Sequence, residues 1–244
     1  MARGPSKKIL DRRGRVAAIL PILEETYPGA KCSLNFKSPL ELLVATILSA
    51  QCTDERVNIV TKTLFRKYRK PADYAAAPAD ELEKDIQSTG FYRNKARSLR
   101  AMAQSLIDHH NDEVPRTMDE LTKLAGVGRK TANVVLGNAF GINVGVVVDT
   151  HVTRLSNRLK LTSHESDAIK IEQDLIEVVP QEKWTEWSHL MIYHGRRVCQ
   201  ARKPKCDHCE IFKHCPSGPK LISETSPPSS SPPEGLPVDA SPEA

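Results

Sequence analysis

The chain has 244 residues, of which 39% are hydrophobic and 27% charged, so it is long enough for one or two globular domains with a buried core. No apolar run is long enough to cross a membrane and none follows the N-terminal charges, which argues against a membrane or secreted protein and predicts a cytoplasmic one. The formal net charge is +5, and because residues 217–244 hold one lysine and four acids, residues 1–216 carry +8. This basic part favours a polyanionic partner such as DNA.

The hydrophobic pattern predicts helices along most of the chain. Residues 1–14 hold five cations and one acid, and we predict a disordered basic tail there. Ser38 and Pro39 are a typical N-cap and first helical residue, and the apolar run after them predicts a buried helix. The predicted helices cover residues 15–27, 39–50, 54–68, 80–87, a long segment that ends near 110, 117–124, 129–140, 150–159, 166–178 and 182–193.

No sheet is predicted, so the predicted fold class is all-α. Residues 145–149 contain three consecutive valines, which favour a strand, but no partner strand is evident elsewhere. We therefore predict an extended connector at this point. Residues 226–233 contain only proline and serine, and the whole stretch 217–244 is predicted to be a disordered tail.

A glycine-rich turn joins two of the predicted helices. Gly126, Val127 and Gly128 lie between the helices, and Arg129 and Lys130 begin the second one. Glycine allows backbone conformations closed to other residues, and the amide groups at a helix N-terminus bind anions such as phosphate. The turn is therefore either an ordinary helix cap or a phosphate site. Because helices flank it on both sides, it is not the strand-first dinucleotide fingerprint.

Lys130 and Asp149 are the candidate reactive pair. A lysine attacks as a nucleophile only when it is neutral, and a helix N-terminus and a neighbouring arginine both disfavour the ammonium form. The alternative role for Lys130 is simple phosphate binding. Asp149 precedes a predicted helix, where carboxylates commonly cap the backbone amides. It is therefore either an N-cap alone or also the partner of Lys130.

Four of the six cysteines lie within 17 residues of one another. In a reducing compartment such a group indicates a metal site more often than two disulfides. Four thiolates suit either zinc or an iron–sulfur cluster, and His208 or His214 is an alternative ligand in a zinc site. The four cysteines are Cys199, Cys206, Cys209 and Cys215.

Three cations lie in the loop between the first two of these cysteines. They are Arg202, Lys203 and Lys205. Such charges either remain solvated or contact nucleic-acid phosphates, and a loop held by metal ligands favours the second role.

Four strings of this sequence resemble the endonuclease III family of helix-hairpin-helix DNA glycosylases. The strings are residues 48–54, the glycine-rich turn with its two helices, residues 148–151, and the spacing of the four cysteines. The resemblance covers residues 15–216 and implies a [4Fe–4S] cluster on these cysteines. One departure is Ala125, where many members of the family have proline.

The resemblance implies a bifunctional DNA glycosylase and abasic-site lyase. Its substrate is double-stranded DNA with oxidised pyrimidines or abasic sites, and the damaged base is flipped out of the duplex. Lys130 matches the nucleophile that forms a Schiff base before β-elimination cuts the strand 3′ to the site, and Asp149 matches an essential aspartate. Gln51 matches a residue that fills the space of the flipped base. Phe91 matches an apolar wedge, or is a core or loop aromatic. His151 is expected at the mouth of the pocket.

The same resemblance implies two helical domains with the active site in the cleft between them. Residues 32–145 are expected to form a six-helix domain with the hairpin at about 117–140, and residues 15–31 with 146–216 a discontinuous iron–sulfur domain. We expect a monomer on chromosomal DNA.

Two alternatives differ in the reactive pair. One is a monofunctional adenine or mismatch glycosylase, which lacks the lysine. The other is a non-catalytic iron–sulfur DNA-binding protein, which does not need both Lys130 and Asp149.

Overall fold

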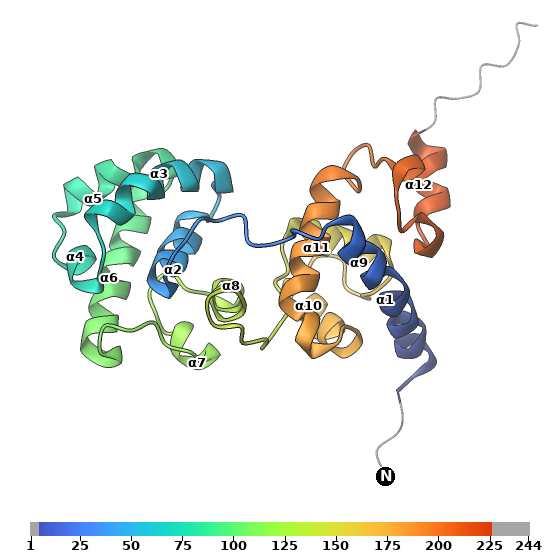
Figure 1. Cartoon of the computed structure of the whole chain (residues 1–244), viewed down its shortest axis with the longest axis horizontal. Helices are drawn as coiled ribbons and strands as arrows, with labels where there is room; N and C mark the ends of the chain where they lie inside the picture. Colours follow the sequence, from blue (N-terminus) through green and yellow to red (C-terminus); the bar gives the residue numbers. More distant parts are fainter. Residues whose placement is uncertain (1–4, 226–244) are drawn as a thin grey trace, which may run out of the picture.

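The computed structural model describes residues 5–225, and all regular secondary structure in this part is helical (Figure 1). The predicted all-α class is therefore confirmed. Within the described part, no helix combines the length and the apolar character that a membrane span requires. The helices are α1 (Lys7–Thr26), α2 (Pro39–Leu48), α3 (Asp54–Lys67), α4 (Pro71–Ala75), α5 (Ala79–Ile86), α6 (Tyr92–His110), α7 (Met118–Leu121), α8 (Arg129–Phe140), α9 (Thr150–Arg158), α10 (Ala168–Val178), α11 (Trp184–Arg197) and α12 (Gly218–Thr225).

The first lobe, on the left of Figure 1, is built around α2. Seven consecutive residues of this helix, Leu42 to Leu48, are buried because α3, α6 and α8 pack around it. Ser38 caps α2 by accepting a hydrogen bond from the backbone N–H of Glu41 at 3.2 Å, and Pro39 takes the first helical position. The start of this helix is therefore confirmed as predicted. The buried core of the lobe draws its residues from 34–136.

The second lobe, on the right of Figure 1, has its own core. Its buried residues come from 16–27, which are most of α1 and its C-cap, and from 146–211, and Trp187 of α11 is fully buried among them. Helix α11 packs against α9 and α1 within this lobe and also contacts α8 of the first lobe. The chain passes between the lobes twice, and the contact between α8 and α11 lies at their junction.

The prediction of a disordered tail over residues 1–14 is wrong from Lys7 onward, because α1 begins there instead of at Arg15. Its basic side chains have partners on the second lobe. Arg12 is buried, donates to the hydroxyl of Ser163 at 2.7 Å and lies 3.5 Å from a carboxylate oxygen of Asp174. These contacts lie about 150 residues away in sequence, so charge composition alone did not reveal them.

The prediction of a disordered C-terminal tail is also wrong for the first residues of that tail. Residues 218–225 form α12, which packs against the short 3-10 turn Cys206–His208. Gly218 lies against Phe212, and a Cβ atom at this position would come within 2.7 Å of the phenyl ring. The proline- and serine-rich run 226–233 lies outside the described residues.

The segment before α9 is an extended connector, as predicted. Residues 145–148 are buried and make no strand pairing within residues 5–225. The backbone N–H of Val147 donates instead to the hydroxyl of Ser188 on α11 at 3.0 Å. This buried stretch leads straight to Asp149 and fixes its position against α11.

Candidate active site and cysteine cavity

A cavity of about 280 Å³ lies where the two lobes meet. Gln51 reaches it from the end of α2, Lys130 from the start of α8, and Asp149 from the residue before α9. Helix α11 closes another side with His189 and Arg196. Three residues predicted from separate strings of the sequence therefore line one cavity.

Asp149 is the N-cap of α9, and only one of its two carboxylate oxygens accepts the capping hydrogen bonds. Its Oδ1 accepts hydrogen bonds from the backbone N–H groups of His151 and Val152, both at 2.8 Å. Its Oδ2 has no hydrogen-bond partner among residues 5–225 and belongs to a side chain that lines the cavity. The cap therefore orients the carboxylate and leaves one oxygen for chemistry.

Lys130 is the second residue of α8 and is exposed. It lines the cavity and also a wider open hollow of about 810 Å³ on the other side of Asp149. Both residues therefore face the same two spaces, and a substrate atom can approach them from solvent.

Arg129 follows the glycine-rich turn beside Lys130, and its charge has a partner on the second lobe. Its Nε and Nη2 donate to the two carboxylate oxygens of Glu172 on α10 at 2.7 and 3.0 Å. Glu172 is 4% exposed and also accepts a hydrogen bond from Asn133 at 2.8 Å. The sequence did not reveal this pair, because its members are 43 positions apart. Arg129 thus joins α8 of the first lobe to α10 of the second.

The turn before α8 has one glycine that its backbone requires. Gly126 has φ of +79°, and a Cβ atom there would come within 3.0 Å of Ser98. Gly128 has an extended backbone, but the space beside it is open, so a phosphate can approach the amides at the N-terminus of α8. Val127 does not share this surface. Its side chain is in the core and its N–H donates to the carbonyl of Leu124.

Gln51 and Phe91 are both in the left-handed backbone region, with φ of 53° and 48°. Side chains other than glycine rarely adopt this conformation, and residues that do so cluster at functional sites. Phe91 is 63% exposed, so it is not the core aromatic of the alternative interpretation. Both side chains are free to meet a ligand.

Lys95 is a buried residue that the sequence reasoning missed. Its ammonium group donates to the carbonyls of Leu48 and Thr89, both at 2.8 Å, and burial lowers its pKa. Leu48 ends α2 just before Gln51, and Thr89 lies just before Phe91. The helical spacing of the sequence indicates that position 95 is buried, because it lies on the same face of α6 as the buried positions 99, 102 and 106. A lysine at the first position of this otherwise apolar face is unusual and points to buried hydrogen-bond partners.

His151 lies beside the cavity rather than in it. Its Nδ1 is 3.0 Å from Nη2 of Arg154, whose guanidinium also donates to the carbonyls of Gly195 and Cys199. Burial lowers the pKa of His151. This network ties α9 to the end of α11, so His151 supports the wall next to Asp149.

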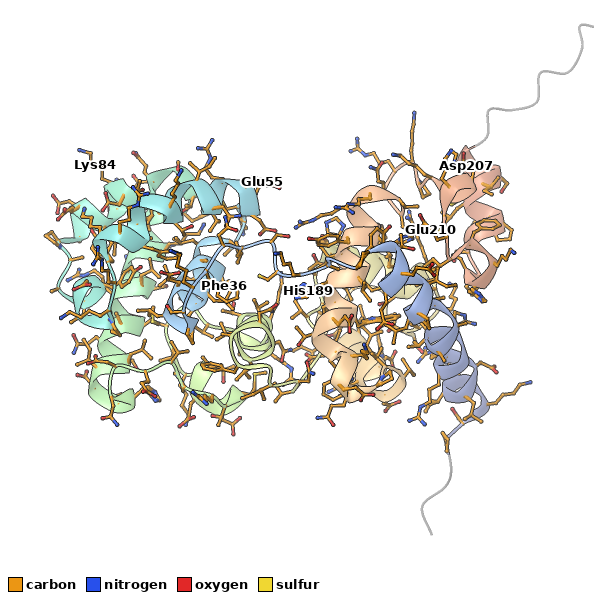
Figure 2. The ribbon with its side chains drawn as sticks, viewed as in Figure 1. Phe36, Glu55, Lys84, His189, Asp207 and Glu210 are labelled. Atoms are coloured by element: carbon orange, nitrogen blue, oxygen red, sulfur yellow. The ribbon has the colours of Figure 1, made fainter. Side chains whose placement is uncertain are left out.

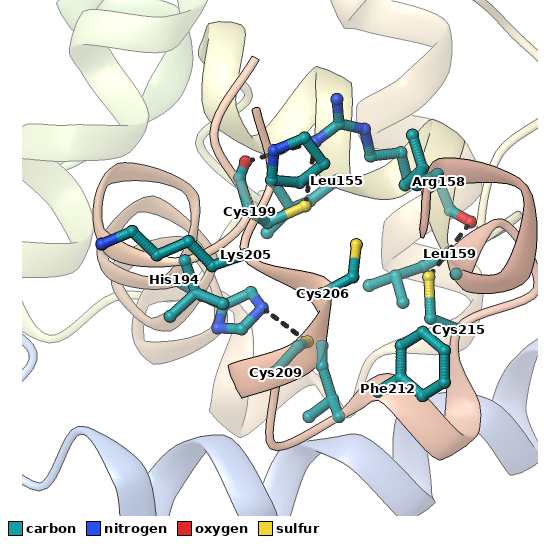
Figure 3. A pocket seen from close by; sticks show the side chains of 15 residues that line it. Leu155, Arg158, Leu159, His194, Cys199, Lys205, Cys206, Cys209, Phe212 and Cys215 are labelled. Atoms are coloured by element: carbon teal, nitrogen blue, oxygen red, sulfur yellow. Dashed lines mark hydrogen bonds between the residues drawn. The ribbon is translucent and has the colours of Figure 1, made fainter. Parts of the chain in front are cut away.

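The four clustered cysteines line one cavity (Figure 3). All four are free thiols, and the rest of the wall is largely apolar. The guanidinium of Arg158 donates to Sγ of Cys199 at 3.1 Å, and Nε2 of His194 lies 3.5 Å from Sγ of Cys209. Among residues 5–225, no three histidine, cysteine, aspartate or glutamate side chains meet closely enough to hold a single metal ion. The thiols surround a space instead.

The loop between the first two cysteines presents its cations to solvent. Arg202, Lys203 and Lys205 are exposed, whereas Pro204 between them is buried. The backbone N–H of Lys205 donates to the carbonyl of Val198 at 3.0 Å, which closes the loop. The charges are therefore held on an ordered segment next to the cysteine cavity.

Residues 44–181 match the model of the HhH-GPD superfamily of base excision DNA repair proteins. The chain is 52% identical to endonuclease III of Synechocystis over 86% of this chain and 96% of that protein, and 47% identical to endonuclease III of Bacillus subtilis over 80% and 89%. The chain belongs to the endonuclease III family. This membership confirms the resemblance drawn from the four sequence strings.

Two solved structures of endonuclease III have the same fold as this chain. A trapped covalent intermediate of endonuclease III with DNA is 47% identical and superposes with a TM-score of 0.81, covering 86% of this chain and 98% of that one. A non-covalent endonuclease III–DNA complex gives 46% identity and a TM-score of 0.82 over the same shares. Both neighbours hold DNA, and one of them is bonded to it.

Proposed function

We propose that the cleft between the lobes flips out an oxidised pyrimidine from double-stranded DNA, excises it and then cuts the strand at the abasic site. The chain is thus a bifunctional DNA glycosylase and abasic-site lyase of base excision repair. The observation that carries this proposal is that Lys130 and Asp149 line one cavity at the junction of the two lobes. The covalent DNA intermediate of a relative that is 47% identical supports a nucleophile of this kind.

The chemistry assigns one role to each residue of the pair. The free Oδ2 of Asp149 stabilises positive charge that develops on the sugar and helps transfer protons. The neutral amine of Lys130 attacks the anomeric carbon, the glycosidic bond breaks, and the base leaves with its bonding electrons and takes up a proton. The attached nitrogen then loses a proton and the bond between C1′ and the ring oxygen breaks, so that the oxygen takes up a proton and stays on C4′ as a hydroxyl while a protonated Schiff base forms at C1′. This imine acidifies the adjacent C2′ hydrogen, whose removal expels the 3′ phosphate by β-elimination.

Several surfaces around the cavity are proposed to hold the DNA. The backbone N–H groups at the N-terminus of α8, which follow Gly128, bind a phosphate. Gln51 and Phe91 occupy the opened duplex, and their exposure and left-handed backbones support this role. The ordered loop with Arg202, Lys203 and Lys205 binds further phosphates. His151 acts through the cavity wall, and Arg129 acts through its pair with Glu172.

We also propose that Cys199, Cys206, Cys209 and Cys215 hold a [4Fe–4S] cluster. Four thiols around one largely apolar space fit a polynuclear group, and the donor at Cys199 suits a thiolate ligand. When bound, the cluster supplies cross-links that order the basic loop. The two cores are proposed to be two domains, residues 32–145 and residues 15–31 with 146–216. The protein is proposed to act as a monomer on chromosomal DNA in the cytoplasm.

Borohydride trapping tests the reaction. Lys130→Gln keeps the length and polarity of the side chain but removes the amine, so no stable adduct with an abasic duplex should form while DNA binding persists. Lys123→Gln in the same turn is the matched control and should trap as the native protein does. Native-rate trapping by Lys130→Gln would assign the nucleophile to another amine.

Metal analysis tests the cluster. The purified protein should be yellow-brown and hold about four iron atoms per chain. Cys209→Ser should lose most of this iron and absorbance, whereas the control Cys52→Ser should keep both. A colourless, fully active protein with one zinc ion would contradict the assignment.

A further inference from the structure

His189 lines the cavity that holds Lys130 and Asp149, yet the proposed chemistry gives it no role. It lies on α11 where the two lobes meet (Figure 2). The side chain is partly buried, and burial lowers its pKa. An aromatic ring with two nitrogens at this place raises the question of which nitrogen carries the proton.

Hydrogen bonds from α8 answer this question. The amide nitrogen of Asn138 donates to the carbonyl of Val134 at 2.8 Å, which fixes the orientation of the Asn138 amide, since a carbonyl only accepts. The other amide atom, Oδ1, lies 2.7 Å from Nε2 of His189. Because Oδ1 also only accepts, Nε2 must carry a hydrogen. A neutral ring with hydrogen on Nε2 has a bare lone pair on Nδ1.

This lone pair is available to a ligand. Nδ1 of His189 has no hydrogen-bond partner among residues 5–225, and it is not among the fully buried, unsatisfied atoms. Two serine hydroxyls of the cavity wall are already engaged. Ser49 donates to the carbonyl of Thr46, and Ser188 donates to the carbonyl of Trp184 while it accepts from Val147. His189 therefore has an uncommitted acceptor on a side chain that lines the cavity.

We infer that Nδ1 of His189 accepts a hydrogen bond from the N3–H group of a flipped thymine- or uracil-derived lesion. This inference rests on the proposed function. Enzymes that flip bases recognise them through hydrogen bonds to the Watson–Crick edge, and an N3–H donor is the complement of a fixed acceptor. His189 is then a specificity-determining residue, and Asn138 is the positioning residue that fixes its proton.

A substrate pair tests this contact directly. The duplexes carry either 5,6-dihydrothymine or its N3-methyl analogue, which lacks the donor, and kcat/KM is measured for each. His189→Phe keeps the ring outline and the steric effect of the methyl group but removes the acceptor. The preference of the native protein for the N3–H lesion should fall about tenfold in this variant, as expected for one hydrogen bond. His109→Phe on the surface of α6 is the control and should keep the native preference.

A second variant covers the case in which His189→Phe does not fold. Asn138→Asp still accepts from Nε2 but favours the doubly protonated ring, so that Nδ1 becomes a donor. It should also lose the preference for the N3–H lesion. An unchanged preference in both variants would overturn the inference. Failure of the native protein to cleave or trap at an abasic duplex, which has no base to recognise, would instead overturn the proposed function.

Discussion

Asp149 caps α9 and still has one carboxylate oxygen left for the reaction that we propose. The two interpretations of this residue exclude each other only if both oxygens are needed for the cap. In the structure Oδ1 accepts both backbone hydrogen bonds at the start of α9, and the side chain also lines the cavity beside Lys130. The cap holds the carboxylate in one orientation, so the charge of Oδ2 is fixed without further contacts.

Asp149→Asn is the substitution that separates the two roles. Asparagine caps helices nearly as well, so stability should change by less than about 1 kcal/mol. Excision of a damaged pyrimidine should fall by about 100-fold or more, because the negative charge is lost. Cleavage of a preformed abasic site should fall less, since its base has already left.

The comparison is made by single-turnover kinetics on the two substrates together with thermal unfolding. Asp149→Ser, which keeps a cap but has neither charge nor amide, should lose excision to a similar extent. Native excision by Asp149→Asn would reduce Asp149 to a simple cap.

At the scale of elements, Lys95 of α6 joins the two segments that carry Gln51 and Phe91. Its ammonium group bonds the last carbonyl of α2 and the carbonyl of Thr89, and it lies in the first turn of α6. Gln51 and Phe91 have strained, left-handed backbones close to these hydrogen bonds. We therefore regard Lys95 as a positioning residue for the surface that we propose to meet the opened duplex.

Lys95→Met removes the ammonium group and keeps the length of the side chain. It leaves two buried carbonyls without their donor, which should destabilise the fold by about 2–4 kcal/mol. Excision from duplex DNA should fall further than cleavage of an abasic site in single-stranded DNA, which needs no opened duplex. The exposed Lys84→Met on α5 is the matched control. Equal losses on both substrates would mean that Lys95 is only structural.

Local signals of helix ends were predicted well from the sequence, whereas distant partners were not. Ser38 caps α2 as predicted, because a cap and its amide lie within three residues. Arg12 near the N-terminus is buried rather than solvated, because it donates to the hydroxyl of Ser163, which lies 151 positions further along the chain. Sequence strings identified Lys130 and Asp149, but Lys95 and His189 acquire roles only through contacts made in three dimensions.

At the scale of the whole molecule, the cleft has its shape because two separate cores meet there. Glu172 of the second core lies almost fully buried between Arg129 and Asn133 of α8. Gly145 packs against the same carboxylate, and a Cβ atom at this position would come within 2.0 Å of Oε1 of Glu172. The connector to Asp149 and the helix with Lys130 are therefore both held against one carboxylate.

Arg129→Met tests whether this carboxylate holds the lobes together. Removing one partner of a fully buried pair costs about 3–5 kcal/mol, and because Arg129 is partly exposed we expect about 2 kcal/mol. Glu172→Leu alone should also destabilise, since it leaves Arg129 and Asn133 without their acceptor. The double variant should be more stable than the sum of the single effects predicts, by about 1 kcal/mol or more.

Urea unfolding of the four proteins measures this coupling. Abasic-site trapping, measured where each variant remains folded, should fall with Arg129→Met because Lys130 is the next residue and moves with α8. Additive stabilities with native trapping in Arg129→Met would show that the Arg129–Glu172 pair neither couples the two lobes nor has a part in placing Lys130.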